Sequence, residues 1–163
     1  MRSTCAFRVL TLSITAVVVS TTAISALGDP PADALSAGLR SAAFSIVGTV
    51  SETRPARRRS SFGDEIIVTT AIIRVGETLR GKGPAWLALE VEGGTINDIT
   101  MEASDTPLLN RGDRAVFLID RLPDGRFVPH RRGSGILRLQ ADDHIRDTTL
   151  TLADVRRLAA EAR

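Results

Sequence analysis

Hydrophobic runs separated by turn residues predict a mainly β protein. Six segments rich in β-branched and other apolar residues are predicted to be strands: residues 44–51, 66–75, 86–91, 114–120, 126–129 and 136–139. Their short lengths, with Pro123-Asp124-Gly125 as a hairpin turn, are typical of a small barrel or sandwich. We therefore expect residues 43–140 to form an OB-like β-barrel of five to six strands, closed or partly open.

The end of the chain has a helical pattern. Leu152, Val155 and Leu158 recur at helical spacing, so they would share one apolar face. Thr151 is a good N-cap residue, and Asp154 follows at the position that completes a capping box. Residues 141–163 are therefore predicted to be a turn followed by an amphipathic helix that covers the barrel.

The first 26 residues have the pattern of a secretory signal peptide. Arg2 and Arg8 form a short positive region before an uncharged apolar run, and small residues lead to a cleavage site after Ala26. We expect cleavage and export to the periplasm or the extracellular space. If the segment stayed uncleaved, it would instead anchor the domain in a membrane, with the domain still outside the cytoplasm.

Residues 27–42 are predicted to be a linker between the signal peptide and the barrel. Asp29-Pro30-Pro31 is unsuited both to a helix interior and to a sheet interior. A short helix over residues 32–43 has only a weak pattern. The sequence therefore favours a flexible spacer here.

Cysteine content and charge narrow the possible chemistry. Cys5 is the only cysteine and lies within the predicted signal peptide, so the exported chain would have neither a disulfide nor a thiolate ligand. The chain has 21 basic and 19 acidic residues, and removal of Arg2 and Arg8 leaves the exported part formally neutral. Net charge therefore gives no reason to expect nucleic acid binding.

Short motifs follow one another in an order that resembles a known group of domains. These motifs are Ile46-Val47-Gly48-Thr49-Val50, the strand end at residues 75–81, Arg111-Gly112-Asp113 with the strand after it, and Asp124-Gly125-Arg126-Phe127. The order resembles an uncharacterised group of bacterial secreted domains with an OB-like barrel. The architecture is also similar to the netrin-type module of tissue inhibitors of metalloproteinases. Those inhibitors present an N-terminal cysteine to the protease zinc, and this chain has no cysteine after Cys5, so that mechanism is not implied.

Four arginines form the candidate binding site. Arg54, Arg57, Arg58 and Arg59 are predicted to lie in the loop between the first two strands, which is a common ligand-binding element of OB-like barrels. Their guanidinium groups are suited to phosphates, sulfates and carboxylates. The expected partner is an anionic surface or protein outside the cytoplasm: lipid head groups, polysaccharides or acidic protein patches. The alternative is a solvated, extended loop.

A second candidate contact element is the long loop predicted at residues 95–110. Nucleic acid is an unlikely partner because Trp86, Phe44 and Phe117 are expected in the core, which leaves Phe62 as the one aromatic residue near the arginines. Export also argues against a nucleic acid.

No catalytic, cofactor-binding or metal-binding residues are predicted. His144 follows Asp142-Asp143, but a transition-metal site needs three or four ligands in a fixed geometry. Ser134 lacks the Gly-x-Ser-x-Gly context of a nucleophile elbow. We therefore expect a non-enzymatic binding domain. Two alternatives stay open: a small exported hydrolase that uses carboxylates or His130, and a structural envelope component held by an uncleaved anchor.

Overall fold

A computed structural model describes residues 32–60 and 62–162 of the chain. The main strands in these ranges are β1 (Phe44–Arg59), β2 (Glu65–Arg80), β3 (Trp86–Glu92), β6 (Arg114–Arg121), β7 (Phe127–Pro129) and β8 (Ile136–Arg138). The helices are α1 (Ala32–Ser41) and α2 (Leu152–Glu161), with a short 3₁₀ turn at Arg132–Gly135. A small separate hairpin consists of β4 (Gly94–Ile96) and β5 (Ile99–Met101).

The strand pairings nearly close the sheet into a barrel. The strands are paired in the order β1-β2-β3-β7-β6-β8, and the Phe44–Thr49 part of β1 pairs back with β6. All of these pairings are antiparallel except β3 with β7, which meet in parallel at Leu89 and Phe127. The first strand thus pairs with both β2 and β6. This arrangement confirms the predicted OB-like barrel with a C-terminal helix.

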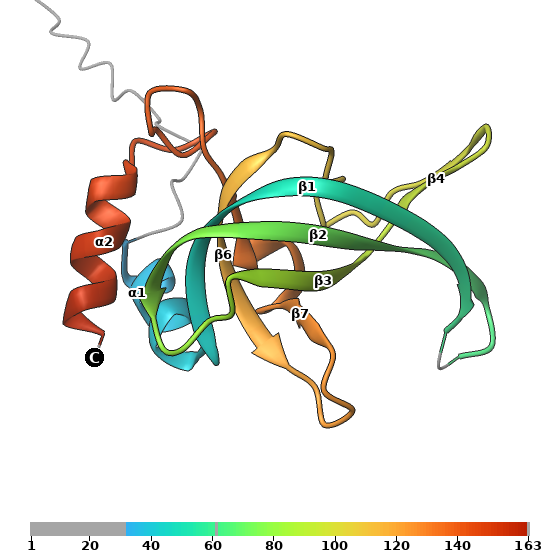
Figure 1. Ribbon diagram of the computed structural model, residues 1–163, viewed down its shortest axis with the longest axis horizontal. Helices are drawn as coiled ribbons and strands as arrows, with labels where there is room; N and C mark the ends of the chain where they lie inside the picture. The colour runs from blue at the N-terminus through green and yellow to red at the C-terminus, as the bar shows by residue number, and fades with distance from the viewer. Residues whose placement is uncertain (1–31, 61, 163) are drawn as a thin grey trace, which may run out of the picture.

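Strand β6 is buried on both of its faces. Ala115, Phe117 and Ile119 point into the barrel, where they pack in the same core as Leu89. Val116 and Leu118 point outward and pack against the helices. The protein therefore has two adjoining cores, one inside the barrel and one between the barrel and its helical layer. The helices lie at one end of the molecule and the β1–β2 hairpin projects toward the other (Figure 1).

Helix α2 forms as the sequence predicted. The Thr151 Oγ1 atom accepts from the backbone N–H of Asp154, and the Asp154 carboxylate accepts from the backbone N–H of Thr151. This capping box satisfies backbone donors that a free helix end would leave unpaired. Leu152, Val155 and Leu158 are buried against the outer face of the barrel, so the helix does cover it.

The expectation of a flexible spacer is wrong for residues 32–41, because these residues form the helix α1. Leu35 and Leu39 are buried in the outer core together with residues of α2 and β6. A helix of this length gains most of its stability from tertiary packing, which the weak local pattern does not report. Residues 27–31 of the predicted linker, and the whole predicted signal peptide, lie outside the described residues.

Two other expectations also need correction. The 95–110 segment contains the β4–β5 hairpin, whose strands are too short to give a clear sequence period. Trp86, expected in the core, is 56% exposed. The predictions for Phe44 and Phe117 are confirmed, since both are buried inside the barrel.

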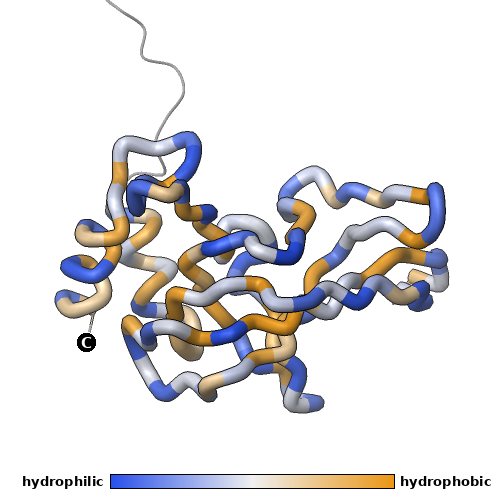
Figure 2. Tube along the Cα trace, turned by 45° about the horizontal axis from the view of Figure 1, so that its top comes forward, coloured by the Kyte–Doolittle hydropathy of each residue, from blue (hydrophilic) through white to orange (hydrophobic). Residues whose placement is uncertain are grey.

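Hydrophobic positions are concentrated in the barrel strands, whereas the protruding turns are largely hydrophilic (Figure 2). The Asp124–Gly125 turn that precedes β7 is closed by a hydrogen bond from the Gly125 N–H to the Leu122 carbonyl, and Gly125 has a positive φ of 89°. No helix within the described ranges is long and apolar enough to cross a membrane.

Gly48 is predicted to be essential for the packing inside the barrel. A Cβ atom at this position would lie 2.4 Å from Ile73 Cγ2 and 3.2 Å from the Arg74 carbonyl oxygen. Gly48→Ala should therefore lower the free energy of unfolding by about 1–3 kcal/mol, as overpacking does in tight cores. Urea denaturation measures the effect. The matched control is Gly76→Ala, where the nearest atom is 3.7 Å away; equal losses in both variants would contradict the packing argument.

Candidate functional site

The four candidate arginines lie in a strand and not in a loop. β1 continues through all of them, with Arg54 paired to Thr70 and Arg59 paired to Glu65 in an unbroken register. Pro55 lies within this stretch. It is tolerated because, in the described part of the chain, β1 beyond Thr49 pairs with β2 alone and has a free edge. The predicted loop location is therefore wrong, because β2 supplies a pairing partner for the whole basic segment.

The strand geometry separates the four arginines. Alternation along β1 places Arg54 and Arg58 on one face of the hairpin and Arg57 and Arg59 on the other. Arg54 forms a bidentate contact with Glu52 at 2.7 and 2.9 Å, both groups being exposed. The structure therefore does not bring the four guanidinium groups together as a single anion-binding cluster.

The other arginines are also engaged to different degrees. Arg57 Nη1 lies 3.1 Å from Glu65 Oε1, and Arg58 makes a bidentate contact with Glu90 at 2.7 and 2.9 Å. Arg59 has no ion pair with any residue in the ranges 32–60 and 62–162. Exposed pairs of this kind contribute about 0–1 kcal/mol, so a ligand can displace them. The Arg58–Glu90 pair is different because its carboxylate is only 13% exposed.

Glu90 is the centre of an ion-pair network. Burial acts to raise its pKa, but hydrogen bonds from Arg58 and Arg126 outweigh this effect and hold the pKa below its ordinary value. Arg126 Nη1 lies 2.7 Å from the second carboxylate oxygen, and Arg126 also contacts Asp124 in the same turn. The network therefore ties the β1 strand and the 122–126 turn to the middle of β3.

Outward side chains of β1, β2 and β3 form one continuous surface, which we call the sheet face. Its members are Glu52, Arg54 and Arg58 from β1, Thr70, Ile72 and Arg74 from β2, and Trp86, Ala88 and Glu90 from β3. The pairing of neighbouring strands sets these residues side by side: Arg54 of β1 lies beside Thr70 of β2, and Arg74 of β2 lies beside Trp86 of β3. The face thus combines an exposed indole with guanidinium groups at both ends.

The position of Trp86 follows from strand alternation. Leu87, Leu89 and Val91 all point into the barrel, so residues 86, 88 and 90 must point outward. The hydrophobic character of tryptophan suggests burial, whereas the period of two in this strand indicates exposure. The alternation is present in the sequence and is the signal that could have identified this residue.

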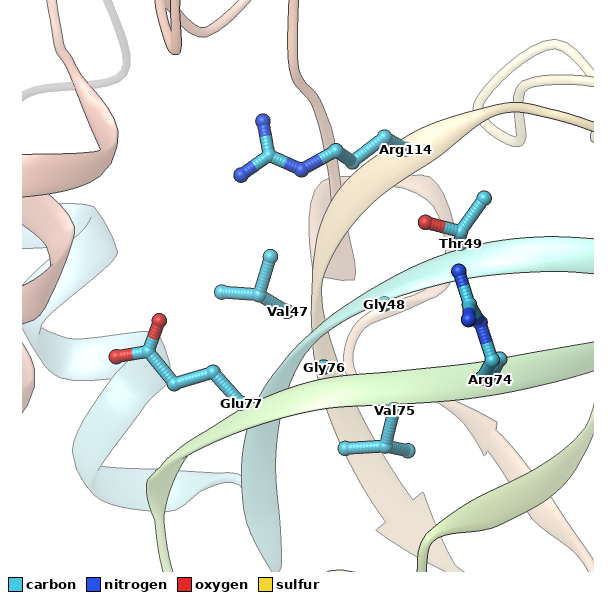
Figure 3. Close-up of a pocket in the computed structure, with 8 residues that line it drawn as sticks. All are labelled: Val47, Gly48, Thr49, Arg74, Val75, Gly76, Glu77 and Arg114. Atoms are coloured by element: carbon cyan, nitrogen blue, oxygen red, sulfur yellow. The ribbon is translucent and has the colours of Figure 1, made fainter.

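A groove continues the sheet face where the helical layer ends. Its volume is about 360 Å³, and Thr49, Arg74 and Arg114 point to the same side of the sheet around it (Figure 3). Arg114 forms an ion pair with Asp143, and Glu77 at the far rim binds Arg156 of α2. Arg74 has no ion pair with any described residue, so its charge is available at the groove.

The two histidines lie in different settings. His144 is exposed in the turn before α2, where its imidazole is beside Asp142. His130 is buried and contacts Ser41 of α1 and Asp120 of β6. Sequence reasoning missed Ser41 and Asp120 because neither lies in a local motif with His130. Among the described residues, no group of three or more His, Cys, Asp or Glu side chains is placed to hold a metal ion.

Glu90→Gln should destabilise the protein, because it removes the charge that two guanidinium groups share. We expect a loss of about 1.5–3 kcal/mol at pH 7, the range for hydrogen bonds to charged groups. Because the folded-state pKa of Glu90 is lowered, its contribution is complete above the ordinary value of 4.5 and disappears as the pH falls through the folded-state pKa.

Thermal unfolding between pH 3 and pH 8 measures this effect, and the gap between wild type and variant should close at the acidic end. Glu92→Gln is the matched control, because Glu92 pairs with Arg132 and its side chain is 50% exposed. A gap that stayed constant with pH would contradict the role assigned to the Glu90 carboxylate.

The chain was compared with known proteins. It matches no protein-family model, and no curated protein is significantly similar to it. The barrel topology alone does not define a function, because barrels of this type carry many unrelated sites. The functional interpretation therefore depends on the geometry of the sheet face and its surroundings.

Proposed function

We propose that this protein is an exported binding domain that holds an anionic polysaccharide on its sheet face. One observation carries the proposal: an exposed tryptophan and unburied guanidinium groups share the same outer surface of β1–β3. In OB-like barrels, the face of the second and third strands and the loops beside it are the usual binding surface for oligosaccharides and oligonucleotides. Here Trp86 lies on β3 and Arg74 lies next to it on β2.

The side chains of the sheet face fit a charged sugar polymer. An indole offers a flat apolar surface to a sugar ring, and it retains a polar N–H at its edge. Guanidinium groups bind carboxylates and sulfates through paired hydrogen bonds. Arg74 is free of ion pairs within the described residues, and the partner of Arg54 is exposed and easily displaced. These two arginines are therefore the ones we assign to the ligand.

Arg58 has a supporting role in this proposal. Its bidentate contact with the poorly exposed Glu90 fixes the face and leaves little of its charge for a ligand. Arg57 and Arg59 lie on the opposite side of the hairpin, so they add only long-range attraction. The signal-peptide pattern of residues 1–26 supports a location outside the cytoplasm, where anionic polysaccharides are abundant.

Binding should be weakened by Arg54→Ser with Arg74→Ser. We expect the affinity for heparin and for polygalacturonate to fall at least tenfold, because two charged contacts are lost. Trp86 is the only tryptophan in the chain, so its fluorescence reports contact with the sheet face directly. The wild-type emission should change on titration with polymer, and isothermal calorimetry should give the affinities.

The matched control is Arg40→Ser with Arg157→Ser, which removes the same charge from the helices. This variant should bind almost as well as the wild type. Equal weakening in both double variants would indicate non-specific charge attraction and would contradict the assigned face. Single-stranded DNA and polyglutamate serve as comparison ligands. If either bound more tightly than the polysaccharides, the ligand of the sheet face would be a nucleic acid or an acidic protein instead.

A further inference from the structure

A buried histidine links a serine and an aspartate on the side of the barrel where α1 docks. Ser41 is in the last turn of α1, Asp120 is near the end of β6, and His130 directly follows β7. The Ser41 Oγ atom lies 2.9 Å from His130 Nε2, and His130 Nδ1 lies 2.8 Å from Asp120 Oδ2. None of these residues belongs to the sheet face.

The antiparallel pairing of β6 with β7 positions Asp120 and His130. The His130 backbone N–H donates to the Leu118 carbonyl, and Asp120 pairs with Val128 in the same ladder. The third member is brought in by the packing of α1 on the outer core. Gly38, one turn before Ser41, allows the helix to approach closely, because a Cβ atom there would lie 3.0 Å from Leu118 Cδ2.

The hydrogen-bonding capacities of the three groups define the position of the proton. An ionised carboxylate only accepts hydrogen bonds, so Asp120 selects the imidazole form that carries its proton on Nδ1. In this tautomer the Nε2 lone pair is directed at the Ser41 hydroxyl. This is the order of nucleophile, base and orienting carboxylate that activates serine in hydrolases on unrelated folds.

The Ser41 hydroxyl has a competing acceptor in its own helix. Its Oγ atom also lies 2.8 Å from the Ala37 carbonyl oxygen, with the Gly38 carbonyl oxygen farther away at 3.3 Å. A hydroxyl has one proton, and rotation of its O–H bond decides whether the proton is directed to the Ala37 carbonyl or to Nε2. Ser41 is exposed to solvent while the imidazole is buried, so a substrate can reach the oxygen without displacing the base.

A small cavity adjoins the imidazole. Its volume is about 100 Å³, which is roughly the space of three water molecules. Its lining includes Ala34, Leu35, Leu118 and Leu137 as aliphatic walls, with Arg131 and Ser134 as polar groups. A space of this size, with His130 in its lining, can hold a short acyl chain of a few carbons.

We propose that Ser41, His130 and Asp120 form a hydrolytic site for short-chain carboxylic esters. Ser41 Oγ attacks the ester carbonyl carbon while its proton passes to His130 Nε2. The bond to the leaving oxygen then breaks, His130 returns the proton to the departing alcohol, and the acyl group remains on Ser41. Water attacks this acyl-serine with its proton passing to Nε2, and the carboxylic acid leaves as Ser41 regains the proton.

The test uses purified protein produced from the full 163-residue sequence. Hydrolysis of p-nitrophenyl acetate, butyrate and octanoate is followed, and a fluorophosphonate probe is mapped by mass spectrometry. The wild type should hydrolyse the two short esters and carry the probe on Ser41. Ser41→Ala should lose probe labelling, and both Ser41→Ala and Asp120→Asn should lower the hydrolysis rate about 100-fold or more.

Ser36→Ala is the matched control, because Ser36 lies on the same helix and its hydroxyl accepts from Arg40. It should hydrolyse and label like the wild type, and circular dichroism should confirm that all variants are folded. A folded wild type that neither hydrolyses the esters nor labels on Ser41 overturns the proposal. So does a folded Ser41→Ala protein that retains its rate. In either case the group acts only to fasten α1 to the barrel.

Discussion

The burial of β6 on both faces is the constraint on which the rest of the structure depends. Its alternating side chains enter two different cores, with Phe117 inside the barrel and Leu118 under the helices. A strand of this kind cannot remain at the surface of a bare barrel, since its outward residues would be exposed to water. The helical layer formed by α1 and α2 is therefore required by the sequence of this one strand.

Coverage by the helices divides the outer surface of the barrel into two parts. Where α1 and α2 pack, the outward residues of β1 and β6, such as Val47 and Val116, are aliphatic. Beyond the helices most outward residues of β1, β2 and β3 are polar or charged, with Ile72, Trp86 and Ala88 as apolar members of the sheet face. The groove around Arg74 and Arg114 marks the border between the two parts (Figure 3). The sheet face is open because the helical layer ends there.

The proposed ester site lies where α1 packs on the barrel. α1 reaches the β6–β7 hairpin, and its last turn places a hydroxyl against a buried imidazole. This contact satisfies His130 in a position where an unpaired polar group would be costly. The sheet face and this group share no residue, so each can be altered without removing the other. Variants of the sheet face can therefore serve as controls for the ester site, and variants of the ester site as controls for the sheet face.

Local patterns determined much of the fold. Runs of β-branched and apolar residues predicted the barrel strands, the capping pair Thr151 and Asp154 predicted the start of α2, and Gly125 predicted the turn before β7. Such features depend on residues that are close in sequence, so they can be recognised without a three-dimensional context. The alternation of side chains in β3 also indicates that Trp86 is exposed, although the hydrophobic character of tryptophan suggests burial.

Tertiary structure alone decided the rest. The extension of β1 through the arginines required β2 as a partner, and α1 required the outer core. The Arg58–Glu90–Arg126 network joins residues 32 and 36 positions apart, and Ser41 meets His130 across 89 positions. These contacts depend on strand pairing, barrel closure and helix packing, which bring distant side chains within hydrogen-bonding distance. No local propensity encodes that closure, which depends on the summed burial of two cores.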